Sequence, residues 1–108
     1  MPDWLAAVNI LARTLAVYKD ADFYNPAEAV AFAKRACEMT NYSHPEVLDT
    51  LAIAYASNNQ FTEAIETTQK ALNLINPAKQ PQFFSEIESR LQLYKASKSY
   101  SKPLPAIR

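Results

Sequence analysis

Few side chains in this chain of 108 residues could carry out chemistry. His44 is the only histidine and Cys37 the only cysteine, so neither a paired-histidine metal site nor an internal disulfide can form. We interpret Cys37 as a small buried residue on an apolar helix face and His44 as a surface residue beside a helix cap. Phosphate loops rich in glycine are excluded, because the chain contains no glycine.

One acidic loop has a pattern that suggests metal binding. Asp20, Asp22 and Asn25 are spaced like the start of a calcium loop. The glycine and the closing glutamate that such a loop needs are missing. We therefore expect no metal, no cofactor and no enzymatic activity.

The charge of the chain argues against several classes of partner. Eleven acidic and eleven basic residues give a formal net charge of zero. The six basic and two acidic residues from Lys79 onward give that end +4, and the remainder carries −4. Basic residues and tyrosines of this end could touch phosphates, but about four such contacts bind weakly. We therefore expect no nucleic-acid partner.

The N-terminal apolar residues do not form a membrane segment. Asp3, Asn9 and Arg13 interrupt them, so we expect neither a signal peptide nor membrane insertion by this segment. A single cysteine fits a reducing compartment. A complete chain would therefore be cytoplasmic, whereas a fragment of a larger protein could belong elsewhere.

The elements that must position any site are helices. The chain lacks glycine and alternating β-branched runs, and it is rich in good helix formers. Leu48, Leu51 and Tyr55 follow one helical face, and a second stripe in a new phase begins at Phe61. We predict two antiparallel helices, with Asn58 or Asn59 ending the first in place of glycine.

Five further features complete the prediction. One helix covers Trp4 to Tyr18, and another begins at an Asn25 cap and ends near Asn41. Ser43 is predicted to cap the third helix, in a capping box with Glu46. A fifth helix covers about 82–96, and 97–108 is predicted to be a flexible tail because it is rich in serine, lysine and proline.

Pairs of helices repeat along the chain. Leu11-Ala12 is matched by Leu51-Ala52, and small residues match between the second and fourth helices. The run Leu48-x2-Leu51-Ala52-x2-Tyr55, followed by Ala64-x3-Thr68, Ala71 and Pro77, resembles the tetratricopeptide repeat (TPR) family. The chain as a whole resembles the C-terminal end of longer bacterial TPR proteins.

This resemblance implies an architecture. The expected fold is all-α, a right-handed α-α superhelix (TPR-like solenoid) of two helical hairpins plus a C-terminal capping helix. Residues 4–96 would form one domain, with repeat 1 at about 4–41, repeat 2 at about 45–76 and the capping helix at about 82–96.

The resemblance also implies a function: a non-catalytic protein–protein interaction module. A peptide or partner helix would bind in the concave groove, and Asn9 and Arg13, one turn apart, would hold a carbonyl or a carboxylate. Thr50, Gln82 and Glu86 depart from the family's chaperone-tail clamp. The expected groove residues are Asn9, Arg13, Glu46, Asp49, Ile53, Gln82, Ser85 and Ser89.

Alternatives remain open. The first helix has no cap before it, so the chain could form homo-oligomers through Trp4, Leu5 and Val8. We favour instead a chain that is the C-terminal part of a larger protein, which could be an enzyme such as a glycosyltransferase or kinase. Tyr18 and Phe23, beside the long loop, would cover the core or contact a ligand.

Overall fold

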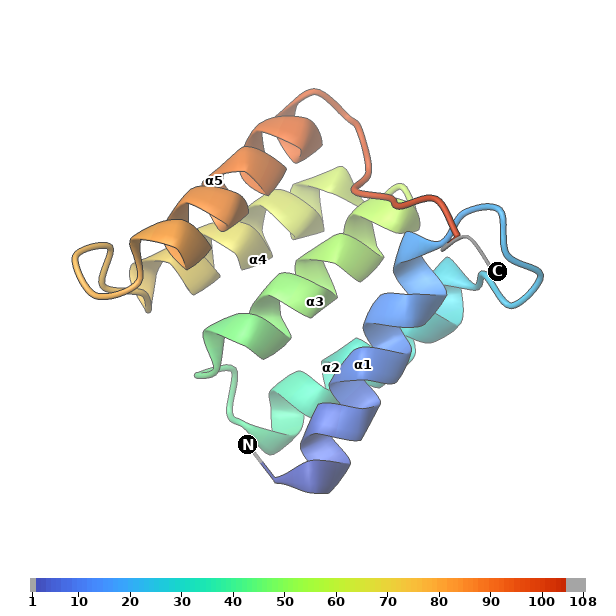
Figure 1. Cartoon of the computed structure of the whole chain (residues 1–108), viewed down its shortest axis with the longest axis horizontal. Coiled ribbons are helices and arrows are strands. Elements are labelled where there is room, and N and C mark those ends of the chain that lie inside the picture. Colours follow the sequence, from blue (N-terminus) through green and yellow to red (C-terminus); the bar gives the residue numbers. More distant parts are fainter. Residues whose placement is uncertain (1, 105–108) are drawn as a thin grey trace.

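This computed structural model describes residues 2–104, which form five α-helices and no strand (Figure 1). The all-helical prediction is confirmed, and each predicted helix is present within a residue or two of its expected bounds. The helices are α1 (Asp3–Val17), α2 (Pro26–Met39), α3 (Pro45–Ser57), α4 (Phe61–Asn73) and α5 (Pro81–Lys95).

The turn between α3 and α4 forms at the asparagines, as predicted. Asn58 is the C-cap of α3, and Asn59 has a left-handed φ of 61°. The Gln60 amide donates to the Tyr55 carbonyl at 2.8 Å, which closes the turn. Asparagine tolerates this conformation better than other residues with a side chain, so it takes the position that glycine usually fills.

The helix starts agree with the prediction at one position and differ at another. Asn25 accepts a hydrogen bond from the Glu28 amide at 3.1 Å and so caps α2. The Ser43 prediction is wrong, because α3 begins at Pro45 with His44 as its N-cap and the Ser43 hydroxyl donates to the Thr40 carbonyl. Hydrogen bonding back to α2 thus replaces the expected capping box.

Helix α3 lies at the centre of the packing. It contacts α1, α2 and α4, while α1 also packs on α2, and α5 packs on α4 (Figure 1). Residues 47–54 of α3 are all buried, charged and polar side chains included. Small residues lie where helices approach closely: Ala29, Ala33 and Ala36 in α2, and Ala64, Thr68 and Ala71 in α4, are all buried.

After α5 the chain turns back toward α1. Ser97 has a φ of 56°, and the following residues run to the C-terminal end of α1 (Figure 1). We call residues 98–104 the C-terminal segment. Its Lys102 amide donates to the Val17 carbonyl at 3.0 Å, and Tyr100 packs partly buried against the core. Within the predicted flexible tail, Ser97, Lys98, Tyr100 and Lys102 thus make defined contacts, while residues 105–108 lie outside the described residues.

Candidate functional site

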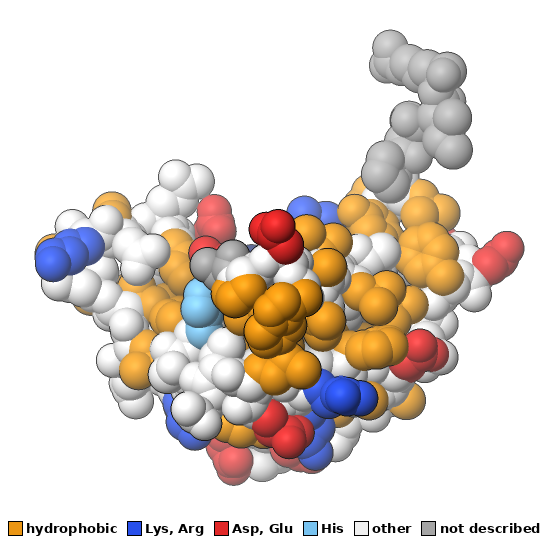
Figure 2. Space-filling view, turned by 90° about the horizontal axis from the view of Figure 1, so that it is seen from below, with side chains coloured by type: hydrophobic (Ala, Val, Ile, Leu, Met, Phe, Trp, Pro, Cys, Tyr) orange, Lys and Arg blue, Asp and Glu red, His pale blue; other side chains and the backbone are white. Residues whose placement is uncertain are grey.

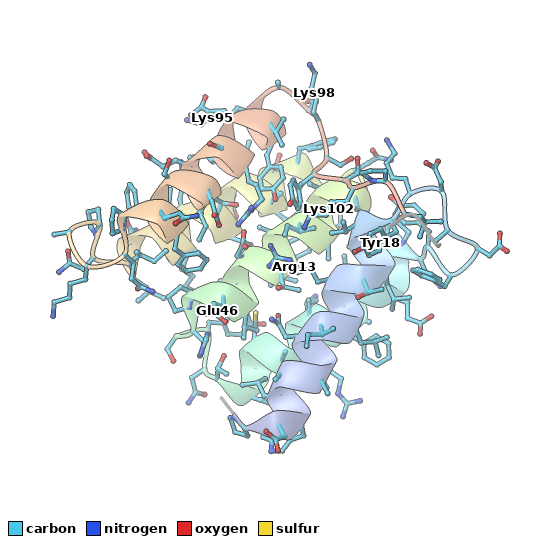
Figure 3. All side chains as sticks on the ribbon, in the orientation of Figure 1. Arg13, Tyr18, Glu46, Lys95, Lys98 and Lys102 are labelled. Carbon is cyan, nitrogen blue, oxygen red and sulfur yellow. The ribbon has the colours of Figure 1, made fainter. Side chains whose placement is uncertain are left out.

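A groove lies between α1, α5 and the C-terminal segment. Its hollow has a volume of about 470 Å³. Figure 3 shows Arg13 of α1 and Lys102 of the C-terminal segment projecting into the space between these elements. The residues that line the groove are Arg13, Glu86, Ser89, Arg90, Leu93, Tyr100 and Lys102.

The floor of this region contains two arginines that share one carboxylate. Arg90 donates from Nε and from its second amino group to the two oxygens of Asp49, at 2.9 and 2.7 Å. Arg13 donates to Asp49 Oδ2 at 3.2 Å. The side chains of Asp49 and Arg90 are 1% and 8% exposed, while that of Arg13 is 34% exposed. We call these three residues the ionic triad.

The triad keeps Arg90 charged in spite of its burial. Burial by itself lowers the pKa of the Arg90 guanidinium, because it penalises the charged form. The charge of Asp49 and the hydrogen bonds to it act in the opposite direction and prevail, so the pKa is raised overall. Arg90 also lies over the Tyr100 ring, with 5.1 Å from its guanidinium carbon to the ring centroid. The triad therefore connects α1, α3 and α5 to the C-terminal segment.

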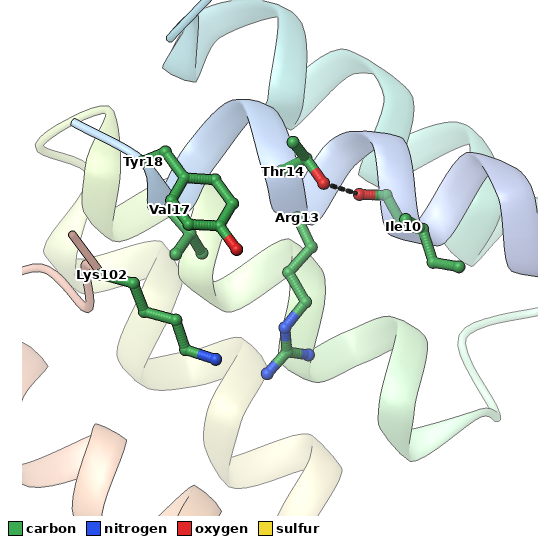
Figure 4. Close-up of a pocket in the computed structure, with 6 residues that line it drawn as sticks. All are labelled: Ile10, Arg13, Thr14, Val17, Tyr18 and Lys102. Carbon is green, nitrogen blue, oxygen red and sulfur yellow. Dashed lines mark hydrogen bonds between the residues drawn. The ribbon is translucent and has the colours of Figure 1, made fainter. Parts of the chain in front are cut away.

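A smaller pocket opens beside the groove and shares two residues with it. Figure 4 shows the Arg13 guanidinium, the Lys102 ammonium and the Tyr18 hydroxyl turned toward the same space. We call this the Arg13–Lys102 pocket; its volume is about 120 Å³. Ile10, Thr14 and Val17 complete its lining.

The structure places the eight predicted groove residues in different surroundings. Asp49 and Ile53, expected to be exposed in the groove, are 1% and 0% exposed. That expectation is wrong for both, because the surrounding helices and the Arg90 side chain cover the inner face of α3. Arg13 and Ser89 both line the groove between α1, α5 and the C-terminal segment. Glu46, Gln82 and Ser85 are exposed, and Asn9 is half-buried with its side-chain oxygen lacking a hydrogen-bond partner among residues 2–104.

Sequence reasoning missed Arg90, Tyr100 and Lys102 as groove residues. A signal existed for Arg90, which follows Ile87 by three residues and so falls on the buried stripe of α5. Asp49 likewise stands between apolar residues of α3, and a buried charge needs a partner of opposite sign. No comparable signal placed Lys102 beside α1.

The residues first considered for chemistry are placed away from the groove lining. Cys37 is fully buried, as predicted, its thiol is 3.7 Å from the Val47 carbonyl, and burial raises its pKa to about 12. His44, expected at the surface, is half-buried at the start of α3. Within residues 2–104, no three histidine, cysteine or acidic side chains gather closely enough to hold a metal ion. None of the helices in that range combines the length and apolar character needed to span a bilayer.

Apolar side chains also collect on one outer face. Figure 2, a view from below, shows hydrophobic side chains gathered on this face of the molecule. On α1, Trp4 is 54% exposed, and Ile10 and Leu11 are 63% and 43% exposed. Leu5, which was expected to be uncovered together with Trp4, is instead buried.

The fold and the groove define an all-helical protein with a basic, partly enclosed concave surface. Comparison of the chain with protein-family models, with curated proteins and with solved structures gives no match in any of the three. The function must therefore be inferred from the groove itself.

Proposed function

We propose that this chain is a non-catalytic protein-interaction module of TPR-like architecture, in which the groove between α1, α5 and the C-terminal segment receives an extended peptide or a helix of a partner protein. The observation that carries the proposal is the groove itself, with its volume of about 470 Å³. It combines an apolar wall, Leu93 and the Tyr100 ring, with the donors of Arg13 and Lys102. Binding sites for peptides commonly pair apolar contact with a few placed polar groups.

The packing of the helices supports the TPR-like part of the proposal. Each of the first three helices contacts its successor, and α1 also contacts α3, as stacked helical hairpins require. Four buried alanines lie at positions where the repeat motif expects small residues: Ala29 and Ala36 in α2, and Ala64 and Ala71 in α4.

A selection from a displayed random-peptide library tests the proposal. Ser89 is exposed and lines the groove, so Ser89→Trp would fill the groove with a large side chain. The matched control is Gln69→Trp, at an exposed position of α4. We expect peptides selected on the wild type to bind the control equally and the Ser89→Trp variant at least about tenfold more weakly. Equal binding to both variants would refute the groove as the binding surface.

A second function is favoured by the apolar face of α1: self-association. Trp4 and Leu11 are both exposed on this helix, and such exposed residues often mark contact surfaces. Light scattering over a wide range of concentrations tests this function. A dimer that Leu11→Glu dissociates would support it, and a monomer at every concentration would exclude it.

A further inference from the structure

The Arg13–Lys102 pocket brings together donors from the two ends of the chain. The Arg13 guanidinium, the Tyr18 hydroxyl and the Lys102 ammonium face one space, and Ile10 and Val17 add apolar wall (Figure 4). We propose that this pocket binds the carboxylate of a glutamate or aspartate side chain in the peptide that occupies the adjoining groove. The proposal specifies the chemistry of the partner and rests on the proposed function.

The charges around the pocket favour an anion. Arg13, Arg90 and Lys102 supply three positive charges, whereas Asp49 and Glu86 supply two negative ones. Asp49 is shared between two arginines and so cannot neutralise both. Within residues 2–104, Lys102 forms no ion pair. A carboxylate between Arg13 and Lys102 would neutralise the one excess positive charge. The pocket is partly desolvated, so the attraction between opposite charges is stronger there than in water.

The arginine is held in place before any ligand arrives. Asp49 accepts from one amino group of Arg13 at 3.2 Å, and Thr50 Oγ1 lies 3.5 Å from the same nitrogen. A guanidinium has five N–H donors, so others remain for a ligand. Arginine pairs with carboxylates through two parallel hydrogen bonds, which suits this arrangement. Thr14 is not a donor to the ligand, because its hydroxyl donates to the Ile10 carbonyl at 2.7 Å.

The lysine is placed by the C-terminal segment. The backbone amide of Lys102 donates to Val17, and its ammonium lies 5.9 Å from the centroid of the Tyr100 ring. These contacts reduce the freedom that the side chain loses when a ligand binds. Because Lys102 reaches the pocket only when the segment lies against α1, binding of an acidic ligand and docking of the segment should stabilise each other.

The size of the pocket selects a small acidic group over a larger one. A volume of about 120 Å³ admits a carboxylate with its neighbouring methylene groups, which Ile10 and Val17 would contact. Arg13 and Lys102 border both the pocket and the groove. An acidic side chain could therefore enter the pocket while the peptide backbone lies in the groove.

Titration of the full chain, monitored by amide and arginine side-chain NMR signals, tests the inference. The probes are a blocked alanine hexapeptide with two central glutamates, the same peptide with glutamines, and inorganic phosphate. We expect the glutamate peptide to bind saturably, shift the Val17 and Lys102 amides, and bind at least about tenfold more tightly than the glutamine peptide. Lys102→Met should reduce the affinity for the glutamate peptide by about tenfold at low salt, and added salt should reduce that affinity further.

A control variant and two further outcomes distinguish a specific carboxylate site from a general effect of positive charge. Lys98→Met removes the same charge from an exposed position of the same segment and should leave binding unchanged. Equal affinity of the glutamate and glutamine peptides, or no binding of either, would overturn the carboxylate site. The library selection with Ser89→Trp would still decide the groove function, since neutral peptides can succeed there. Phosphate that binds as tightly as the peptide and displaces it would show a general anion site and refute a peptide carboxylate as its ligand.

Discussion

Replacing Asp49 with asparagine removes one negative charge and leaves Arg90 buried without a counter-charge. Arg90 makes both of its hydrogen bonds in the triad to Asp49, at 2.9 and 2.7 Å, and its side chain is only 8% exposed. Removing one partner of such a buried pair costs about 3–5 kcal/mol. A domain of this size has a total stability of about 5–15 kcal/mol, so the loss is a large fraction of it.

Urea unfolding followed by circular dichroism measures this loss, and a thermal scan should show a melting temperature lower by about 12 °C or more. The matched control is Asp22→Asn, at an exposed position of the loop between α1 and α2. It should change the free energy of unfolding by less than about 0.5 kcal/mol. Arg13→Met should cost only about 1 kcal/mol, because Arg13 is partly exposed and screened by water.

A double variant separates lost attraction from an uncompensated charge. Asp49→Leu with Arg90→Met replaces the pair by apolar side chains of similar size, and such exchanges are often neutral. We expect it to recover most of the stability that Asp49→Asn loses. If Asp49→Asn remains within about 1 kcal/mol of the wild type, Arg90 is not confined by the triad and the reasoning fails.

Three further predictions concern single side chains. Burial raises the pKa of Cys37 from 9.0 to about 12, so the stability that the buried neutral thiol contributes is full below pH 9 and is lost as the pH rises toward 12. Urea unfolding between pH 8 and 11 should show a decline in the free energy of unfolding that is less steep in Cys37→Ala. An equally steep decline in that variant would contradict the assignment. The Tyr94 hydroxyl is buried and has no hydrogen-bond partner among residues 2–104. Tyr94→Phe should therefore leave the free energy of unfolding unchanged or raise it by about 1 kcal/mol. A clear loss of stability in urea unfolding would show instead that the hydroxyl is hydrogen-bonded. Asn59→Ala should destabilise by about 1 kcal/mol because of the left-handed φ of 61°, while Asn59→Gly should not; equal melting temperatures for the two variants would contradict this.

The turn at Asn59 shows what local sequence could predict. The change of phase between the stripes around Tyr55 and Phe61 required a reversal, and asparagine was the residue best suited to a left-handed position in a chain without glycine. Both arguments use only neighbouring residues, and the structure confirms them. Ser43 shows the limit of the same approach, since an alternative acceptor at Thr40 takes its hydroxyl.

The site was predicted less completely, because it depends on contacts between distant residues. Asp49 and Ile53 were assigned to an open groove through the family resemblance, which assumes that the inner face of each first helix is exposed. Arg90 lies 41 positions from Asp49 and covers that face. The apolar neighbours of Asp49 indicated burial, but nothing local identified the partner.

The C-terminal segment makes contacts that its composition did not predict. Composition rich in serine, lysine and proline is typical of disordered tails. Amino-acid composition carries no information about single contacts. It could not predict that a tyrosine packs on the arginine of a buried ion pair, or that a backbone amide bonds to the end of α1. Tyr100 and Lys102 make these two contacts, to Arg90 and to Val17.

The triad and the Arg13–Lys102 pocket form one connected arrangement. Asp49 holds Arg13 at the pocket and Arg90 beneath Tyr100, and Tyr100 precedes Lys102 in the segment that completes the pocket. A change at Asp49 should therefore weaken both the fold and the affinity for an acidic peptide. Lys102→Met should affect the affinity alone, because Lys102 is exposed and its backbone amide remains able to bond to α1. Measuring stability and affinity together in these two variants distinguishes a ligand site from a structural cluster of charges.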